Sequence, residues 1–96
     1  MALVVLFDVE GMTAAQYDDV IAALEKAGQA APEGRLTHVA APRPGGWMVV
    51  DTYESEEAFG RFGQHLLPVL AGLGIKVEPR VSPVHSLVVA GAAVAA

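Results

Sequence analysis

Two side chains in neighbouring apolar segments have the chemistry of a proton-transfer pair. His38 lies in the segment RLTHVAA, and Asp51 lies in the segment WMVVDTYE. A neutral imidazole beside a carboxylate can take up or release a proton near neutral pH. If the strand register brings the two together, they form a base and its orienting group; if it does not, Asp51 pairs with Arg35, Arg80 or a backbone amide. For His38 the alternative is a hydrogen bond across the sheet or a dimer interface.

The remaining histidines are weaker candidates for chemistry. His65 lies at the edge of the apolar stripe of a later helical segment, which suits either the rim of a pocket or a half-exposed helix position. We keep it as a third catalytic candidate, whereas His85 is expected to form contacts between chains. The histidines show neither the i, i+4 spacing nor the H-E-x-x-H pattern of zinc sites, and the chain has no cysteine. The sequence therefore predicts no metal site and no cofactor.

The aromatic side chains could line a pocket for a hydrophobic small molecule between helices and sheet. Core packing is the alternative for each of them. The tyrosines and the tryptophan also need partners for their O–H and N–H groups, which favours positions near polar groups or a cavity. The candidates for substrate binding are Phe7, Tyr17, Trp47, Tyr53, Phe59 and Phe62.

The hydrophobic periodicity predicts the elements that position these residues. ALVVLFDVE is a buried strand, and Thr13 with Gln16 is the capping box of a helix that ends near Gly28. RLTHVAA and WMVVDTYE are strands joined by the turn PRPGG, so they form an antiparallel hairpin. Ser55 begins a second helix with Pro68 inside it. IKVE is the predicted fourth strand, and VHSLVV can resume as extended chain.

The order strand–helix–strand–strand–helix–strand predicts an α+β, ferredoxin-like fold with a four-stranded antiparallel sheet. Two helices can cover only one face of such a sheet, yet VVLF and WMVV are apolar on both faces. The chain is 96 residues long, 53% hydrophobic and of mean hydropathy +0.42, which is more apolar material than a small monomer usually buries. We therefore expect a homodimer in which two sheets pack face to face.

Over residues 1–88 the chain resembles the dimeric α+β-barrel superfamily, the antibiotic-biosynthesis-monooxygenase-like group. The resemblance rests on the element order and on WMVVDTYESEEAF, which is similar to the family's strand that ends in an aromatic residue, followed by Glu-Ser and an acidic helix with Phe. It implies a sheet-to-sheet dimer that forms an α+β barrel. The superfamily includes quinone-forming monooxygenases, haem-degrading enzymes, polyketide cyclases, lactone isomerases, chlorite dismutases and members of no known activity, and the fold does not select among them.

Two of these activities lack their expected residues here. Haem-degrading members use an Asn on the first strand and a Trp and a later His on the second helix; this first strand has no Asn, Phe62 lies near the Trp position, and a glycine occupies the His spacing. The plant polyketide cyclase of this fold uses a Tyr and a His, which align with Phe62 and Pro68. His65 matches another histidine of that protein. Neither mechanism is predicted for this chain.

Charge and terminal segments limit the partners and the location. The net charge is −5 and no cluster of Lys and Arg occurs, so a nucleic acid partner is not expected. The N-terminus has no basic region of the kind that begins a signal peptide, and the apolar C-terminal segment LVVAGAAVAA is too short for a bilayer span of about 20 residues. We expect a cytoplasmic protein with no membrane partner, whose domain covers residues 1–88 and whose apolar tail, residues 89–96, is docked on a partner chain or disordered.

These observations support one main hypothesis of function and one alternative. The main hypothesis is a small cofactor-independent enzyme, monooxygenase-like or cyclase/isomerase-like, that abstracts a proton from a hydrophobic aromatic or polyketide-like molecule. His38 moves the proton and Asp51 orients His38. The alternative is a non-catalytic dimeric protein that binds a small molecule or is purely structural. The enzyme hypothesis predicts a pocket with His38 on its wall; the alternative predicts no cavity and histidines fully hydrogen-bonded.

Overall fold

The predicted order of elements and the α+β class are confirmed. A computed structural model describes residues 1–94 of the chain. The elements are β1 (Leu3–Glu10), α1 (Ala14–Lys26), β2 (Arg35–Arg43), β3 (Gly46–Tyr53), α2 (Glu56–Gly72), β4 (Arg80–Pro83), β5 (Leu87–Val89) and β6 (Ala92–Val94). The elements from β1 to β4 make the ferredoxin-like βαββαβ unit.

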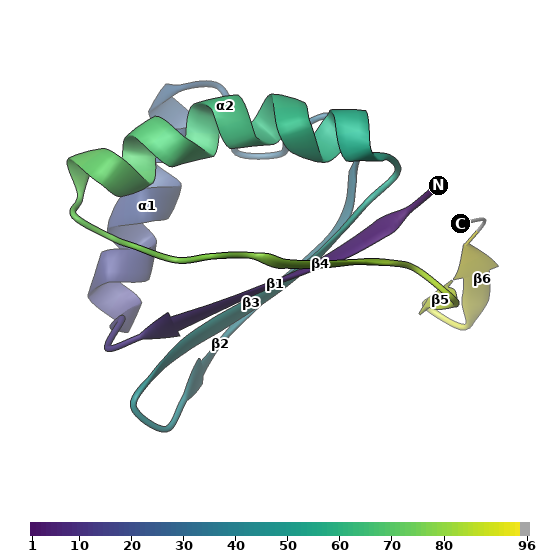
Figure 1. Cartoon of the computed structure of the whole chain (residues 1–96), viewed down its shortest axis with the longest axis horizontal. Coiled ribbons are helices and arrows are strands. Elements are labelled where there is room, and N and C mark those ends of the chain that lie inside the picture. The colour runs from purple at the N-terminus through teal and green to yellow at the C-terminus, as the bar shows by residue number, and fades with distance from the viewer. Residues whose placement is uncertain (95–96) are drawn as a thin grey trace.

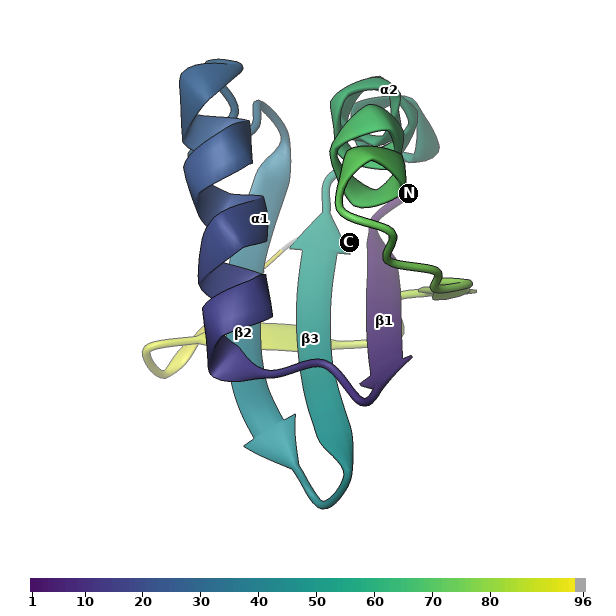
Figure 2. The same cartoon turned by 90° about the vertical axis from the view of Figure 1, so that its left-hand side faces the viewer.

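The main sheet has the strand order β2-β3-β1-β4, and all its neighbouring strands are antiparallel. Both helices lie over the same face of this sheet (Figure 1), and a view turned by 90° looks onto this face, with α1 in front of β2 (Figure 2). The hydrophobic core lies between the sheet and the helices. Its fully buried or nearly buried members are Val5, Phe7, Val9, Met12, Val20, Leu24, Val49, Tyr53, Ala58, Phe62, Leu66 and Leu70.

Both helices begin at the caps that the sequence predicts. At α1 the Gln16 amide donates to Thr13 Oγ1 at 3.2 Å, and the Thr13 amide donates to Gln16 Oε1 at 2.9 Å, which completes the capping box. At α2 the Ala58 amide donates to Ser55 Oγ at 3.1 Å. These caps satisfy amides that the helix leaves free, and the first one places Tyr17 in the first turns of α1, over the sheet.

The predicted fourth strand is wrong in position. IKVE, residues 75–78, forms no strand, although Ile75 and Val77 pack against the core and so imitate the alternation of one. The strand that pairs with β1 is Arg80–Pro83. Because β4 is at the edge of the sheet, Pro83 costs the sheet no inner hydrogen bond.

The chain after β4 forms a separate small hairpin. β5 pairs with β6 around Ala90 and Gly91, whose φ angles of 51° and 83° are those of a tight hairpin turn with two left-handed central residues. The hairpin lies apart from the four-stranded sheet (Figure 1). Residues 95–96 of the predicted tail lie outside the described residues.

The sheet face away from the helices is apolar along its middle. Val39 and Met48 lie on it with 60% and 39% of their surface exposed, and Leu6 and Val50 are half-buried neighbours. At one end of this open face Arg43 donates to Asp8 at 2.7 Å and to Glu10 at 2.8 Å. Within residues 1–94 no helix is long and apolar enough to cross a bilayer.

Candidate functional site

The hairpin of β2 and β3 brings His38 and Asp51 together. They are directly opposed in the strand pair, and His38 Nδ1 lies 2.5 Å from Asp51 Oδ1. A β-bulge at Leu36, between Arg35 and Thr37, shifts the register at the start of β2 without disturbing the pairing further along. Of the two outcomes that the sequence left open, the structure has the one in which the imidazole and the carboxylate meet.

A tyrosine extends this pair at each end. Tyr17 Oη, from α1, lies 2.7 Å from His38 Nε2, and Tyr53 Oη, from β3, donates to Asp51 Oδ2 at 2.8 Å. We assign the proton between His38 and Asp51 to His38 Nδ1, which donates to Asp51 because an ionised carboxylate can only accept. In the neutral imidazole His38 Nε2 then accepts from the O–H of Tyr17. We call this connected series of Tyr17, His38, Asp51 and Tyr53 the relay.

Asp51 and Tyr53 are the buried members of the relay, whereas Tyr17 and His38 are half-buried. Asp51 and Tyr53 are 1% and 0% exposed, and the side chain of His38 is 23% exposed. The two hydrogen bonds to Asp51 offset the cost of burying its charge. Burial raises the pKa of Tyr17, and burial together with the charge of Asp51 raises the pKa of Tyr53. Both hydroxyls therefore keep their protons at neutral pH.

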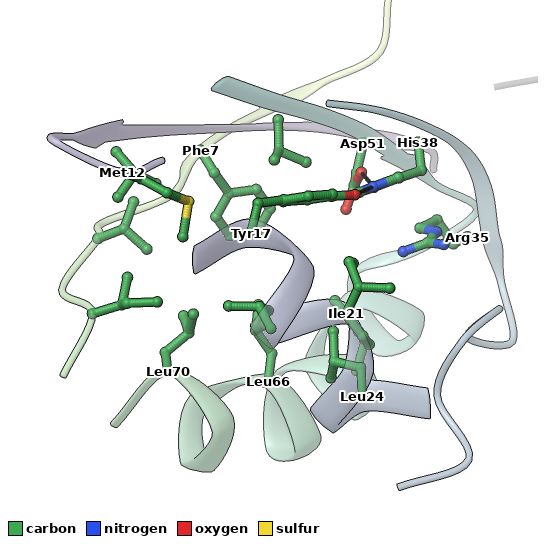
Figure 3. Close-up of a pocket in the computed structure, with 16 residues that line it drawn as sticks. Phe7, Met12, Tyr17, Ile21, Leu24, Arg35, His38, Asp51, Leu66 and Leu70 are labelled. Carbon is green, nitrogen blue, oxygen red and sulfur yellow. Dashed lines mark hydrogen bonds and ion pairs between the residues drawn. The ribbon is translucent and has the colours of Figure 1, made fainter. Parts of the chain in front are cut away.

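The relay borders a cavity of about 60 Å³ between the helices and the sheet (Figure 3). Its polar wall consists of Tyr17, Arg35, His38 and Asp51. An engineered cavity of about 150 Å³ in another protein binds benzene, so this smaller cavity encloses only a small group unless its walls move apart. The rest of the lining is apolar: Phe7, Val9, Met12, Val20, Ile21, Leu24, Val49, Phe62, Leu66, Leu70, Ile75 and Val77.

Of the six aromatic residues predicted to bind substrate, three line the cavity and three pack behind its wall. Phe7, Tyr17 and Phe62 line the cavity, whereas Trp47 stacks on Tyr17 with ring centroids 5.3 Å apart. Tyr53 holds Asp51, and Phe59 packs on Tyr53 at 5.0 Å and edge-on against Phe7 at 6.5 Å, outside the cavity lining. Trp47 Nε1 is buried and has no hydrogen-bond partner among the described residues.

The structure separates His65 and His85 from the relay. His65 lies on the exposed side of α2 and does not line the cavity, and His85 is exposed in the segment before β5. No group of three or more side chains suited to a metal ion occurs within residues 1–94.

Arg35 is the cavity residue that the sequence did not identify. Regular alternation along the strand would give Leu36 the same face as His38, but the bulge inserts Leu36 as an extra residue and leaves it 39% exposed. Arg35 takes that face instead. Its guanidinium carbon lies 5.9 Å from the ring centre of Phe62, and its Nη2 donates to the Ala30 carbonyl at 3.3 Å. The sequence shows a cation at the start of a predicted strand, but the face that this cation occupies depends on a bulge that the sequence does not predict.

Solved structures with the same fold share little sequence with this chain. No protein-family model matches the sequence, and neither does any curated protein. Rv0793 from Mycobacterium tuberculosis superposes with a TM-score of 0.64 at 17% identity, over 88% of this chain and 96% of its own. A candidate antibiotic biosynthesis monooxygenase from Chloroflexus aurantiacus gives 0.61 at 18% identity, over 86% and 92%.

SnoaB from Streptomyces nogalater, a cofactor-independent oxygenase, was solved as a single-site mutant. It superposes with a TM-score of 0.59 at 19% identity, over 88% of this chain and 91% of its own. At such identities the likeness shows the fold alone. The chain has the fold of the antibiotic-biosynthesis-monooxygenase-like structures, in agreement with the resemblance drawn from its element order.

Proposed function

We propose that the protein is a small cofactor-independent enzyme that abstracts a proton from a hydrophobic substrate at the Tyr17 end of the relay. The observation that carries the proposal is the unbroken series of hydrogen bonds from Tyr17 through His38 to the buried Asp51, next to an apolar cavity. In many enzymes the reactive hydroxyl is hydrogen-bonded to an imidazole, and a carboxylate is hydrogen-bonded to the other nitrogen of that imidazole and orients it.

The structure supports a specific division of roles. His38 has both ring nitrogens occupied, so the group available to a substrate is the Tyr17 hydroxyl. As the substrate C–H proton moves to Tyr17 Oη, the original Tyr17 proton moves to His38 Nε2, and Asp51 stabilises the imidazolium that forms. The raised pKa of Tyr17 fits this role because a protonated tyrosine avoids a resting tyrosinate in an apolar cavity.

Two reactions can follow from the same carbanion. In an isomerisation or cyclisation the proton returns from Tyr17 to a different atom of the substrate. In an oxygenation the carbanion of a CH₂ group adds dioxygen, and the resulting peroxide loses water to leave a ketone. One oxygen atom enters the product, the other leaves as water, and the substrate supplies all the electrons, so no cofactor is needed. The activity of SnoaB favours the oxygenation.

A non-catalytic role is the alternative, and one observation favours it. Both nitrogens of His38 are hydrogen-bonded within the protein, as expected of a histidine that only fixes the docking of α1 on the sheet. The small volume of the cavity points the same way. A protein of this kind would bind a small molecule, or none, without changing it.

Hydrogen–deuterium exchange at an acidic C–H distinguishes the two. We would incubate the protein in D₂O with 2-pentanone, a slender ketone whose α-CH₂ is acidic, and follow loss of the proton signal by NMR, with an oxygen electrode in parallel. The enzyme should accelerate exchange, and Tyr17→Phe and His38→Ala should each lower the acceleration by about 100-fold. His65→Ala is the matched control and should leave it unchanged. Equal exchange in all four proteins would support the non-catalytic alternative.

We also propose that a second copy of the chain covers the open sheet face. Val39 and Met48 are exposed there, and an apolar face of this kind usually meets a partner. Light scattering after size exclusion should show a dimer that Val39→Lys converts to a monomer. Leu67→Lys, at a 66% exposed position on α2, is the control and should leave the dimer intact. A wild-type monomer at micromolar concentration would refute the proposal.

A further inference from the structure

Arg35 is the one permanently charged cation among the described residues that line the cavity. No carboxylate of residues 1–94 lies within ion-pair distance of it, in contrast to Arg43, which has two. Its hydrogen bond to the Ala30 carbonyl is long, at 3.3 Å. A guanidinium presents five N–H donors, so Arg35 keeps donors for a ligand.

The surroundings of Arg35 hold its guanidinium beside the relay. The ring of Phe62 lies beneath it at 5.9 Å, a cation–π distance, and Figure 3 shows Arg35 at the His38 and Asp51 end of the cavity, away from Met12 and Leu70. Arg35 and Tyr17, the proposed base, line the same cavity. The charge of Arg35 opposes the rise in the pKa of both Tyr17 and Tyr53.

Asp51, the one acid among the described residues that line the cavity, does not compete for Arg35. Asp51 is 1% exposed, and its two oxygens accept from His38 and Tyr53. The remaining wall, towards Leu66 and Leu70, is apolar. The cavity thus has one cationic end and an apolar interior, which matches a molecule with an anionic group and a hydrocarbon chain.

We propose that Arg35 binds the carboxylate of a hydrophobic organic acid, whose hydrocarbon part enters the cavity beside Tyr17. This rests on the proposed function in one respect: the acid is the substrate whose C–H group Tyr17 meets. The small volume limits the part of the acid that is enclosed to a slender chain. Arginine suits this role because its planar N–H groups match the two oxygens of a carboxylate.

The test compares butyrate with butyramide, which have the same shape but differ in charge. Backbone amide shifts of the ¹⁵N-labelled full-length chain would be followed by NMR during titration with each probe. Butyrate should bind more tightly than butyramide and should move the signals of Arg35 and Tyr17. Arg35→Met should weaken butyrate binding about tenfold or more and leave butyramide unchanged, and Arg35→Lys should fall between.

Arg80→Met is the matched control, since it removes the same charge from an exposed position on β4 and should not change butyrate binding. Four results would overturn the inference: no butyrate binding to the wild type, equal binding of the two probes, undiminished butyrate binding by Arg35→Met, or an equal loss in Arg80→Met. Tyr17→Phe separates the two proposals. It should keep butyrate binding but lose the exchange activity. If the wild type binds butyrate but catalyses no exchange, the proposed function is refuted and the binding role of Arg35 is not.

Discussion

Replacing Tyr53 by phenylalanine tests whether the relay is built around a buried carboxylate. The substitution keeps the ring, which is fully buried against Phe59 and Phe62, and removes only the hydroxyl that donates to Asp51 at 2.8 Å. A hydrogen bond to a charged acceptor contributes about 1.5–3 kcal/mol to stability. We therefore expect Tyr53→Phe to lower the free energy of unfolding by about 2 kcal/mol, or the Tm by about 8–16 °C for a domain of this size.

Urea unfolding gives the measurement, with Trp47, the single tryptophan, as the fluorescent probe. Protein concentration must be the same for every variant, because dimer formation would make stability depend on it. Tyr17→Phe is the matched control: its hydroxyl is only half-buried and donates to a neutral imidazole, so its removal should cost about 1 kcal/mol. A loss below about 0.5 kcal/mol for Tyr53→Phe would refute the view that Asp51 is a buried anion held by both neighbours.

Three further predictions concern stability. The raised pKa of Tyr53 means that the folded state favours its neutral form, so this contribution to the free energy of unfolding is present below about pH 10 and is lost as the pH rises further. We expect the free energy of unfolding to fall by about 1.4 kcal/mol at pH 11 in urea unfolding experiments. The fall should be smaller in Tyr53→Phe. His38→Ala should cost about 1–3 kcal/mol because it leaves buried partners unpaired, whereas His65→Ala should stay within about 0.5 kcal/mol in the same urea assay. Gly34→Ala should lower the Tm strongly, because its φ is +85° and a Cβ there would lie 2.5 Å from a buried α2 side chain; Gly28→Ala, with φ +75° and free space, isolates the backbone strain.

The helices and the hairpin could be predicted because their signals are local. Thr13 and Ser55 are caps within one turn of the residues that they bond, and the PRPGG turn lies between two apolar segments. The position of β4 could not be predicted in this way. Ile75 and Val77 alternate like a strand, but only the partner, β1, decides which residues pair, and it pairs from Arg80 onwards.

The sequence identified residues of the site but not the contacts between them, because those contacts depend on how distant segments pair. His38 and Asp51 stood out as polar residues in apolar segments, but their meeting depends on register, which a shift of one residue reverses. Tyr17 was placed on an aromatic wall, and its bond to His38 follows only from the docking of α1 on the sheet. Periodicity reports which face a side chain occupies; it does not report which atoms of two elements come within hydrogen-bond distance.

The bulge at Leu36 decides which side chain at the start of β2 faces the cavity, so the polarity of this end of the cavity depends on the number of residues before Thr37. Because Leu36 is extra, Arg35 lies opposite Tyr53. If regular pairing continued from Thr37 through residue 36 and the loop before Arg35 were one residue shorter, Leu36 would lie opposite Tyr53 and face inward, and the guanidinium would face outward to water. A single codon deletion in that loop would thus exchange the cationic end of the cavity for an apolar one while the remainder of the fold stayed in place.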